Sequence, residues 1–228
     1  MFEYFYHEIL RKTVIGFGTL FNNVQIRKVD GTGKGISVMK VPLAYGPIQK
    51  FLARVEQAPD LKGAQTLTLP RLSFEFTGMS YDPSRKVTQT QTFLTAPTSD
   101  KTSARQVYMP VPYNMTFELN ALAKLNDDAL QMVEQILPYF QPSYNLNINL
   151  VSSIGEKRDV PIVLDSVSFT DDYEGDFSER RALIYTLTFT AKTYLFGPVP
   201  SASTGLIKKA TIDYSTRKGK DFRREVRY

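Results

Sequence analysis

Hydrophobic and polar residues alternate along residues 111–121. The odd positions carry Val, Tyr, Met, Phe, Leu and Ala, whereas the even positions carry Pro, Asn, Thr, Glu and Asn. A period of two predicts a strand with one buried face. After this strand the period becomes that of an amphipathic helix. Its apolar face carries Leu130, Val133, Ile136 and Leu137, and its polar face carries Gln131, Glu134 and Gln135. We therefore predict an amphipathic strand that leads into a short amphipathic helix.

The sequence also marks both ends of this helix. Asn126 or Asp127 is expected to cap the first turn, where the helix dipole favours the charges of Asp127 and Asp128. Pro138 disfavours helical geometry at Leu137, so the helix is expected to stop there.

Two elements are predicted near the N-terminus. Around residues 4–14 we expect a short helix or an extended segment, because Gly16 and Gly18 interrupt any long helix. Residues 23–29 and 35–45 flank the glycine-rich string DGTGKG and are expected to form a hairpin. That string lacks the Lys-Ser/Thr pair of a phosphate loop, so we interpret it as a turn.

A second helix is predicted from Gly46-Pro47 to about Gln57. Proline is favoured in the first turn of a helix. One face of this helix is apolar and carries Ile48, Phe51, Leu52 and Val55.

Four further stretches alternate between apolar and polar residues and are expected to be strands: 72–76, 144–150, 162–169 and 183–191. The third stretch changes phase, which predicts a bulge near Asp165-Ser166. The fold class is therefore predicted to be α+β. We expect a mostly antiparallel β-sheet of about six or seven strands with two or three covering helices, plus an extended basic C-terminal arm.

Charge is distributed unevenly along the chain. From Gly205 to Tyr228 there are eight basic and three acidic residues, so this segment carries the whole net charge of +5. Residues 198–205 have the composition of a linker. We therefore divide the chain into a single α+β domain at 1–197 and a linker with a basic C-terminal arm at 198–228.

The residue types that most catalytic and metal sites require are scarce. There is no cysteine and a single histidine, His7, which we expect on the surface or at an interface rather than as a base. The carboxylate pairs at 127–128 and 171–172 are explained by a helix N-terminus and an acidic turn, and residues 171–176 lack calcium-loop spacing. We expect no enzymatic activity, no cofactor and no metal. Nothing resembles a signal peptide or a transmembrane helix, so a soluble protein is expected.

The basic arm has three interpretations. Its cations and interleaved aromatic residues suit nucleic acid, its composition suits a disordered solubilising tail, and its charge suits an acidic protein surface. We favour the protein partner because an electrostatic tail does not need apolar anchors, which this arm has at Leu206, Ile207, Ala210, Ile212 and Tyr214.

The most distinctive text in the chain is DDALQMVEQILPYFQP at 127–142. It resembles the corresponding segment of the tail sheath stabiliser and completion (tail terminator) proteins of T-even-type contractile-tailed bacteriophages. Other similar strings recur in the same order over residues 1–196: MFEYFY, LFNNVQI, VPLAY, LPR, and RR before LTF. The sequence is expected to depart from the family after about Phe196.

This resemblance implies a structural virion protein. Proteins of that family form a hexameric ring that caps the tail tube and sheath and connects the tail to the neck of the head, and genomic DNA passes through the ring. The implied partners are therefore further copies of the chain and the tube, sheath and neck proteins, with no membrane. The implied location is the neck end of the tail, after assembly in the host cytoplasm. The alternative is a nucleic-acid-binding module that acts through the basic arm.

Interface candidates are the segments without a buried face of their own. Residues 87–93 belong here because they have the composition of a strand but two polar faces, which predicts an edge hairpin or arm. Tyr139 and Phe140 lie between Pro138 and Pro142. We predict Phe140 in the core, whereas Tyr139 is compatible with the core or with an interface. The partner-binding candidates are Phe2, Tyr4, Phe5, Tyr6, Val87, Gln89, Gln91, Phe93, Tyr139, Arg217, Lys218, Lys220, Arg223, Arg224 and Arg227. For the N-terminal aromatic residues, packing on their own subunit is the competing interpretation.

Overall fold

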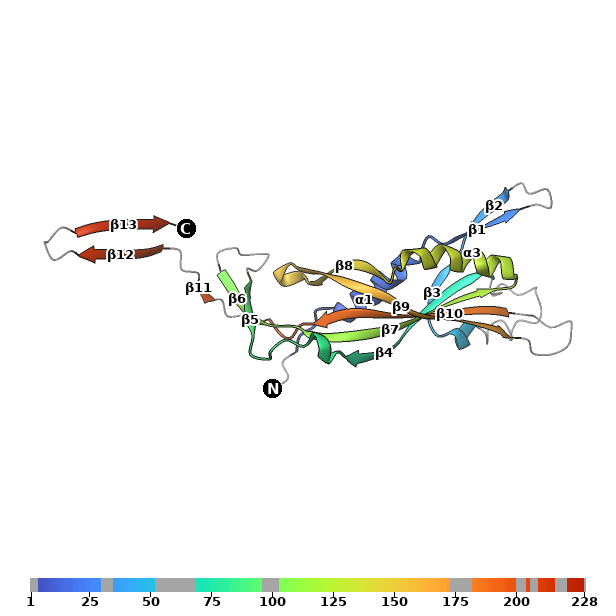
Figure 1. The fold of residues 1–228 in the computed structure, drawn as a ribbon, viewed down its shortest axis with the longest axis horizontal. Coiled ribbons are helices and arrows are strands. Elements are labelled where there is room, and N and C mark those ends of the chain that lie inside the picture. Colours follow the sequence, from blue (N-terminus) through green and yellow to red (C-terminus); the bar gives the residue numbers. More distant parts are fainter. Residues whose placement is uncertain are drawn as a thin grey trace.

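The computed structural model describes residues 4–29, 35–51, 69–95, 103–172, 182–199, 204–205, 209–215 and 221–227. Its largest sheet has the strand order β3-β4-β7-β10-β9-β8 (Figure 1). All neighbours in it are antiparallel except β3 and β4, which are parallel. Its strands are β3 Leu43–Tyr45, β4 Arg71–Tyr81, β7 Val111–Ala123, β8 Ser143–Val151, β9 Glu156–Asp172 and β10 Ala182–Leu195.

Smaller sheets extend from this body at both ends. In Figure 1, β1 and β2 project at the upper right, and β12 and β13 lie beyond the left-hand end. A third small sheet has the order β11-β6-β5. The strands of these sheets are β1 Gln25–Val29, β2 Gly35–Lys40, β5 Thr92–Thr95, β6 Ser103–Tyr108, β11 Thr204–Gly205, β12 Lys209–Ser215 and β13 Asp221–Arg227.

Two helices pack on one face of the large sheet, and the core lies between them and the sheet. They are α1 Ile9–Leu20 and α3 Asn126–Ile136, and the 3₁₀ turns are η1 Pro83–Arg85, η2 Leu137–Tyr139 and η3 Ser152–Ile154. Phe17 of α1 is fully buried, and its ring stacks on that of Phe117 in β7 with centroids 4.4 Å apart. The rings of Phe74 and Phe189 lie 5.6 and 5.4 Å from the same ring. This aromatic cluster joins α1 to β4, β7 and β10.

The strand predictions are confirmed for the large sheet. Along β7 the buried positions include Met115, Phe117 and Leu119, which are the odd positions of the alternation. The predicted bulge is also confirmed, because Thr188 pairs with Ser166 and the next residue of β10 pairs with Leu164, which leaves Asp165 unpaired. The α+β class with a mostly antiparallel sheet and few helices is confirmed as well.

The prediction for the N-terminal segment was wrong about its glycines. The helix begins at Ile9 and runs through Gly16 and Gly18 to Leu20. A Cβ atom at Gly18 would lie 2.6 Å from Cζ of Phe74, and one at Gly16 would lie 2.6 Å from Cδ2 of Leu146. The glycines therefore allow the helix to approach the sheet, and the packing of Phe17 outweighs their low helix propensity.

The cap predicted for α3 was also wrong. Leu125 occupies the N-cap position in an extended conformation, and no side chain caps the helix. The Asp127 carboxylate instead accepts a hydrogen bond from Nε2 of Gln131 at 3.0 Å. The α-helix ends at Ile136 as the proline suggests, but Leu137 keeps helical angles and the chain continues as η2.

The buried stripe of α3 is rotated from the predicted one. Leu130 and Leu137 are exposed, at 47% and 37% of their surface, although both were assigned to the apolar face. The buried residues instead follow the spacing of Ala129, Met132, Val133 and Ile136. Two overlapping apolar stripes are present in the sequence, and packing against β7 and β10 selects the one that starts at the small Ala129.

Two predicted elements are described only in part. Helical residues 48–51 follow Pro47 as expected and Phe51 is buried, but Leu52 and Val55 lie outside the described residues. The acidic turn begins at the end of β9 and continues outside them. In the linker predicted at 198–205, Thr204 and Gly205 form β11 and pair with β6.

We expect Gly18→Ala to lower the free energy of unfolding by about 1–2 kcal/mol, because the added methyl group displaces the buried ring of Phe74, although alanine favours the helix. Gly16→Ala is the matched control: it meets the end of the half-buried Leu146, which can rotate, so we expect a change below about 0.5 kcal/mol. Urea denaturation of both variants measures the difference. Equal losses for the two variants would contradict the close approach at Phe74.

Candidate interaction surfaces

The N-terminal aromatic residues lie on the surface of the subunit. Tyr4, Phe5 and Tyr6 are exposed, Tyr4 over 92% of its surface, and Phe2 lies outside the described residues. The ring of Phe5 lies 5.4 Å from that of His7, and Nε2 of His7 is 2.9 Å from the carbonyl oxygen of Gly197. The imidazole therefore fixes this aromatic segment beside the point where the C-terminal arm leaves the body.

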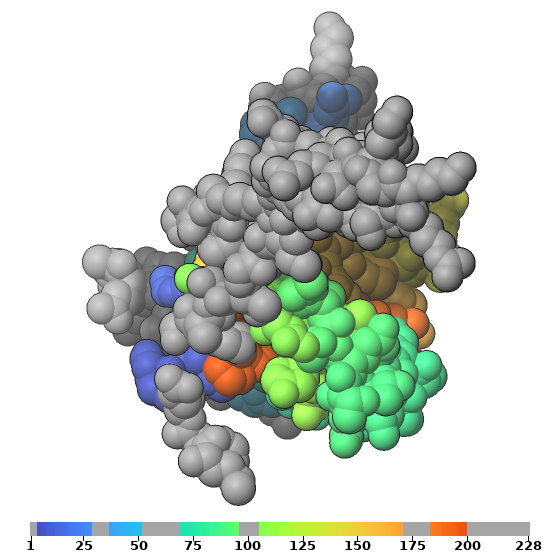
Figure 2. All heavy atoms as spheres, turned by 90° about the vertical axis from the view of Figure 1, so that its left-hand side faces the viewer, coloured from blue at the N-terminus to red at the C-terminus, as the bar shows by residue number. Residues whose placement is uncertain are grey.

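The region around residues 82–95 lies at the same end of the molecule. Figure 2, which faces this end, shows the N-terminal residues in blue beside the end of β10 in orange, with the segment around β4 and β5 in green. Residues 86–91 are not a strand: a turn covers Gln89 and Thr90, and β5 begins only at Thr92. Of the edge hairpin or arm predicted over residues 87–93, only Thr92 and Phe93 belong to a hairpin, which β5 forms with β6, and residues 87–91 precede it.

The candidates in this region differ in exposure. Val87, Gln89 and Gln91 are exposed, whereas Phe93 is half-buried and packs against the core. Backbone hydrogen bonds hold the turn, from Gln91 N to Thr88 O and from Met109 N to Gln91 O, both at 3.1 Å. Three exposed candidates are thus presented on a fixed turn.

Asp82 and Arg85 anchor this turn to the sheet. The carboxylate accepts hydrogen bonds from the backbone N–H and hydroxyl of Ser84 at 3.0 and 2.6 Å and from Nε of Arg85 at 2.8 Å. Nη2 of Arg85 then donates to Oδ1 of Asn114 in β7 at 2.7 Å. The Ser84 hydroxyl, together with Arg85, lowers the pKa of Asp82 well below its usual range.

An arginine–aromatic series continues from this anchor across the sheet. The guanidinium carbons of Arg85 and Arg158 lie 5.0 and 5.1 Å from the centroid of the Tyr194 ring. Arg158 also lies 5.5 Å from the ring of Phe196 and forms an ion pair with Glu156 at 2.7 Å. Such contacts stabilise partly desolvated cations. They connect the turn before β5 to β9 and to the end of β10.

The pKa of a second carboxyl group is shifted in the opposite direction. Glu75 and Glu118 lie directly opposite each other across β4 and β7. Partial burial, and to a lesser extent the charge of Glu118, raises the pKa of Glu75. In the described part of the chain neither carboxylate forms an ion pair with a cation, so the pair destabilises the sheet locally and is not a catalytic dyad.

Two glutamines of α3 pair with the backbone of β1 like a neighbouring strand. Gln135 accepts from the N–H of Gln25 at 3.2 Å and donates to its carbonyl oxygen at 2.6 Å. Gln131 does the same with Arg27, at 3.0 and 3.3 Å. Residues four apart on a helix face thereby match residues two apart on a strand. Both glutamines lie on the predicted polar face of the helix, but no pattern in the sequence indicates this contact.

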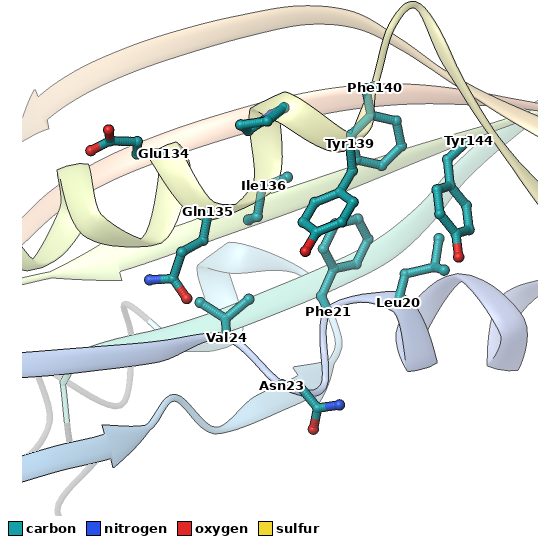
Figure 3. A pocket seen from close by; sticks show the side chains of 11 residues that line it. Leu20, Phe21, Asn23, Val24, Glu134, Gln135, Ile136, Tyr139, Phe140 and Tyr144 are labelled. Atoms are coloured by element: carbon teal, nitrogen blue, oxygen red, sulfur yellow. The ribbon is translucent and has the colours of Figure 1, made fainter.

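A pocket of about 560 Å³ lies beside these contacts, where the ends of α1 and α3 meet the start of β1 (Figure 3). Phe140 is partly buried, as predicted, with its ring 5.0 Å from that of Phe189 and 6.3 Å from those of Phe21 and Tyr144. Tyr139 also lines the pocket and is 69% exposed. Other lining residues are Leu20, Asn23, Val24, Glu134, Gln135, Ile136 and Pro138.

The basic arm contains a hairpin in which β12 and β13 pair over their whole lengths. Arg223, Arg224 and Arg227 lie on β13, opposite Asp213, Ile212 and Lys209 respectively. Arg217, Lys218 and Lys220 lie outside the described residues. The structure therefore places three of the six basic candidates on one strand.

The described part of the chain contains neither a metal site nor a membrane-spanning helix. No group of three or more His, Asp or Glu side chains there is arranged to hold a metal ion. Among the same residues, no helix is both long and apolar enough to cross a membrane.

The sequence was compared with known proteins. The model of the family described as the T4-like virus Myoviridae tail sheath stabiliser matches residues 4–228. The chain is 32% identical over 223 residues to the tail completion protein gp15 of Enterobacteria phage T4, which covers 94% of this chain and 79% of that protein. The family match includes the basic arm, so the expected departure after Phe196 was wrong.

We expect Asp82→Asn to lower the melting temperature at pH 7. The neutral amide of asparagine cannot form the ion pair with Arg85 or accept charge-assisted hydrogen bonds from Ser84. The lowered pKa of Asp82 means that its contribution to stability is complete above the unfolded pKa near 3.8 and is lost as the pH falls through the folded value. The difference from the wild type should therefore shrink as the pH is lowered below 4. Melting curves from pH 7 to pH 2 measure it, and a pH-independent difference would contradict this role.

We expect Phe140→Ala to lower the free energy of unfolding by about 2 kcal/mol, because it removes a ring from the aromatic core. Tyr139→Ala is the matched control, with a change below about 0.5 kcal/mol for an exposed side chain. Chemical denaturation of the two variants gives both values. A loss at Tyr139 as large as that at Phe140 would place Tyr139 in the core instead of at an interface.

Proposed function

The chain belongs to the tail sheath stabiliser family of T4-like Myoviridae, and from this premise we propose that it forms a hexameric ring at the neck end of the tail. It is a structural component of the virion tail and not an enzyme. In the proposal, the ring caps the tail tube and the last ring of sheath and connects the tail to the neck. Genomic DNA passes through the ring, and the ring is added in the host cytoplasm.

The observation that carries this proposal is the family match over residues 4–228, together with the similarity to a tail completion protein of phage T4. The distribution of exposed surfaces supports it. A ring needs heterologous contacts, in which two different surfaces of one subunit meet on neighbouring copies. The chain exposes aromatic residues at one end of the body and apolar residues of α3 elsewhere.

We assign the contacts between copies to two of these surfaces. The first is the N-terminal segment at Tyr4, Phe5 and Tyr6, with Phe2 before it, because large exposed aromatic side chains gain most from burial at an interface. The second is the outer side of α3, where Leu130, Leu137 and Tyr139 are exposed. The first precedes α1 and is held by the contact of His7 with Gly197, and the second belongs to α3 and η2.

The remaining candidates are assigned to tube, sheath and neck. The turn that carries Val87, Gln89 and Gln91, with Phe93 behind it, is fixed to the sheet and presents polar groups. The basic arm extends beyond the body and suits an acidic surface of a neighbouring tail protein. Its basic members are Arg217, Lys218, Lys220, Arg223, Arg224 and Arg227.

A second function is considered because of this charge. A segment with eight basic and three acidic residues can bind phosphates, and DNA passes through the proposed ring. Under this alternative the main function of the chain is to bind nucleic acid through the arm, and ring formation is of secondary importance. The two functions differ in the effect of salt on DNA binding and in the effect of the arm on attachment.

The proposal predicts that the purified protein, alone or with tail tubes and sheath, assembles into hexamers that native mass spectrometry detects. Deletion of residues 206–228 should preserve the hexamer and abolish attachment to sheath or neck, because the body holds the contacts between copies. Arg11→Gln, which changes an exposed arginine of the body, is the control for charge and should leave both unchanged. A protein that stays monomeric alone and with its tail partners would overturn the proposal.

The same deletion decides the alternative. If the arm binds nucleic acid, the intact protein should bind DNA at low salt with an affinity that falls steeply with salt, and the deletion should abolish this binding. The absence of binding by the intact protein at low salt would end this alternative.

A further inference from the structure

The hairpin of β1 and β2 has one closed edge and one open edge. Gln25 and Arg27 direct their backbone N–H and carbonyl groups away from β2, because these groups bond to Gln135 and Gln131 of α3. In an antiparallel pair, backbone groups alternate between the partner strand and the outside. The groups that join the strands therefore belong to the other phase, in which Ile26 pairs with Met39.

The open edge follows from this register. Val38 lies opposite Arg27, and Lys40 lies opposite Gln25, so both direct their N–H and carbonyl groups away from β1. The N–H of Val41, the residue after Lys40, donates a hydrogen bond to the carbonyl oxygen of Val24 at 2.9 Å. Val41 therefore faces β1, as expected if Lys40 faces away from it. No described residue pairs with the outward groups of Val38 and Lys40. Four backbone groups thus form a template for another strand.

The edge of β2 is only partly protected against pairing with another strand. Sheet edges are usually protected by charges, prolines or bulges that keep other strands away. Of the two edge residues, Lys40 is charged, whereas Val38 is uncharged and exposes 59% of its surface, and β2 contains no proline. The bulge of the hairpin lies in β2, where Ile36 has no partner in β1, so the regular part of this edge is confined to Val38 and Lys40. A two-stranded sheet is also marginal by itself, so an additional strand would stabilise it.

The charge of the hairpin indicates what kind of strand could be added to β2. The described residues of β1 and β2 include Arg27, Lys28 and Lys40, all exposed, and no acidic residue. An incoming acidic segment gains from these charges, whereas a basic one is repelled. The hairpin in the arm of a second copy is basic, with Arg223, Arg224 and Arg227 on β13, and is therefore disfavoured.

We propose that β2 accepts an extended acidic segment of another tail protein as an added strand along its open edge. This inference rests on the proposed function, because it places the partner in the assembled tail. The glutamines of α3 close the edge of β1, so the new strand can join the hairpin only at β2. Four backbone groups provide weak binding in isolation, and the other contacts of the assembly supply the rest.

The test is amide hydrogen exchange in the free protein and in the protein incorporated into tails, resolved at single residues. In the free protein the amides of Val38 and Lys40 should exchange quickly, whereas that of Met39 should be protected by Ile26. In tails, exchange at Val38 and Lys40 should slow by about tenfold or more. Equal exchange at these amides in both states would overturn the inference, whereas a protein that is absent from tails would overturn the proposed function instead.

Variants provide the second arm of the test. Val38→Pro removes an outward N–H and no bond to β1, so it should reduce incorporation into tails by about tenfold, whereas Val38→Ala keeps the N–H and should not. Lys40→Glu should reduce incorporation more than Lys40→Gln if the partner is acidic. Slow exchange at Met39 in each variant shows that the hairpin is folded. Equal incorporation of Val38→Pro and Val38→Ala would contradict an added strand.

A second copy is the competing occupant. Protection of Val38 and Lys40 in the purified oligomer, without any other tail protein, would show that the strand comes from the same chain and would overturn the assignment to an acidic partner. Protection that appears only in tails supports it.

Discussion

The packing of Phe17 against the central sheet is the contact on which the rest of the subunit depends. Its ring stacks on Phe117 and lies close to Phe74 and Phe189, so a single side chain of α1 joins three strands. The distance is short because Gly18 faces Phe74 without a Cβ atom. The position of α1 then fixes what lies before and after it, namely the aromatic N-terminal segment and β1. We assign the N-terminal segment, and the edge of β2 that pairs with β1, to assembly.

The body presents two kinds of surface: segments that are held in place by side-chain contacts, and a strand edge with unpaired backbone groups. At one end His7 and the arginine–aromatic series of Arg85, Tyr194 and Arg158 hold exposed segments in fixed positions. On the other side, Gln131 and Gln135 use side-chain amides to satisfy one edge of β1, which leaves only the edge of β2 for a partner. A protein that must join several components benefits from this division, because permanent contacts need rigid surfaces and edge strands accept further chains.

The parts that the sequence could predict are those governed by one local rule. The alternation along β7 and the phase change at Asp165 depend on the period of a strand, and both predictions were confirmed. The position of Gly18 in a helix depends on a distant Phe74, so helix propensity alone gave the wrong answer. The stripe of α3 was misassigned because two apolar registers overlap and only packing distinguishes them. The contacts of Gln131 with Arg27 join residues far apart in the chain, and no local pattern marks them.

The predicted interface residues remain proposals, and the structure adds the exposure of seven of them: Tyr4, Phe5, Tyr6, Val87, Gln89, Gln91 and Tyr139. The central claim is that this body forms a ring at the neck end of the tail. Electron cryomicroscopy of tails, with the head-proximal end reconstructed without imposed symmetry, tests it most directly. Our account predicts sixfold density that fits this subunit between the last ring of sheath and the neck. Density for this subunit elsewhere on the particle, or a different symmetry at that position, would contradict it.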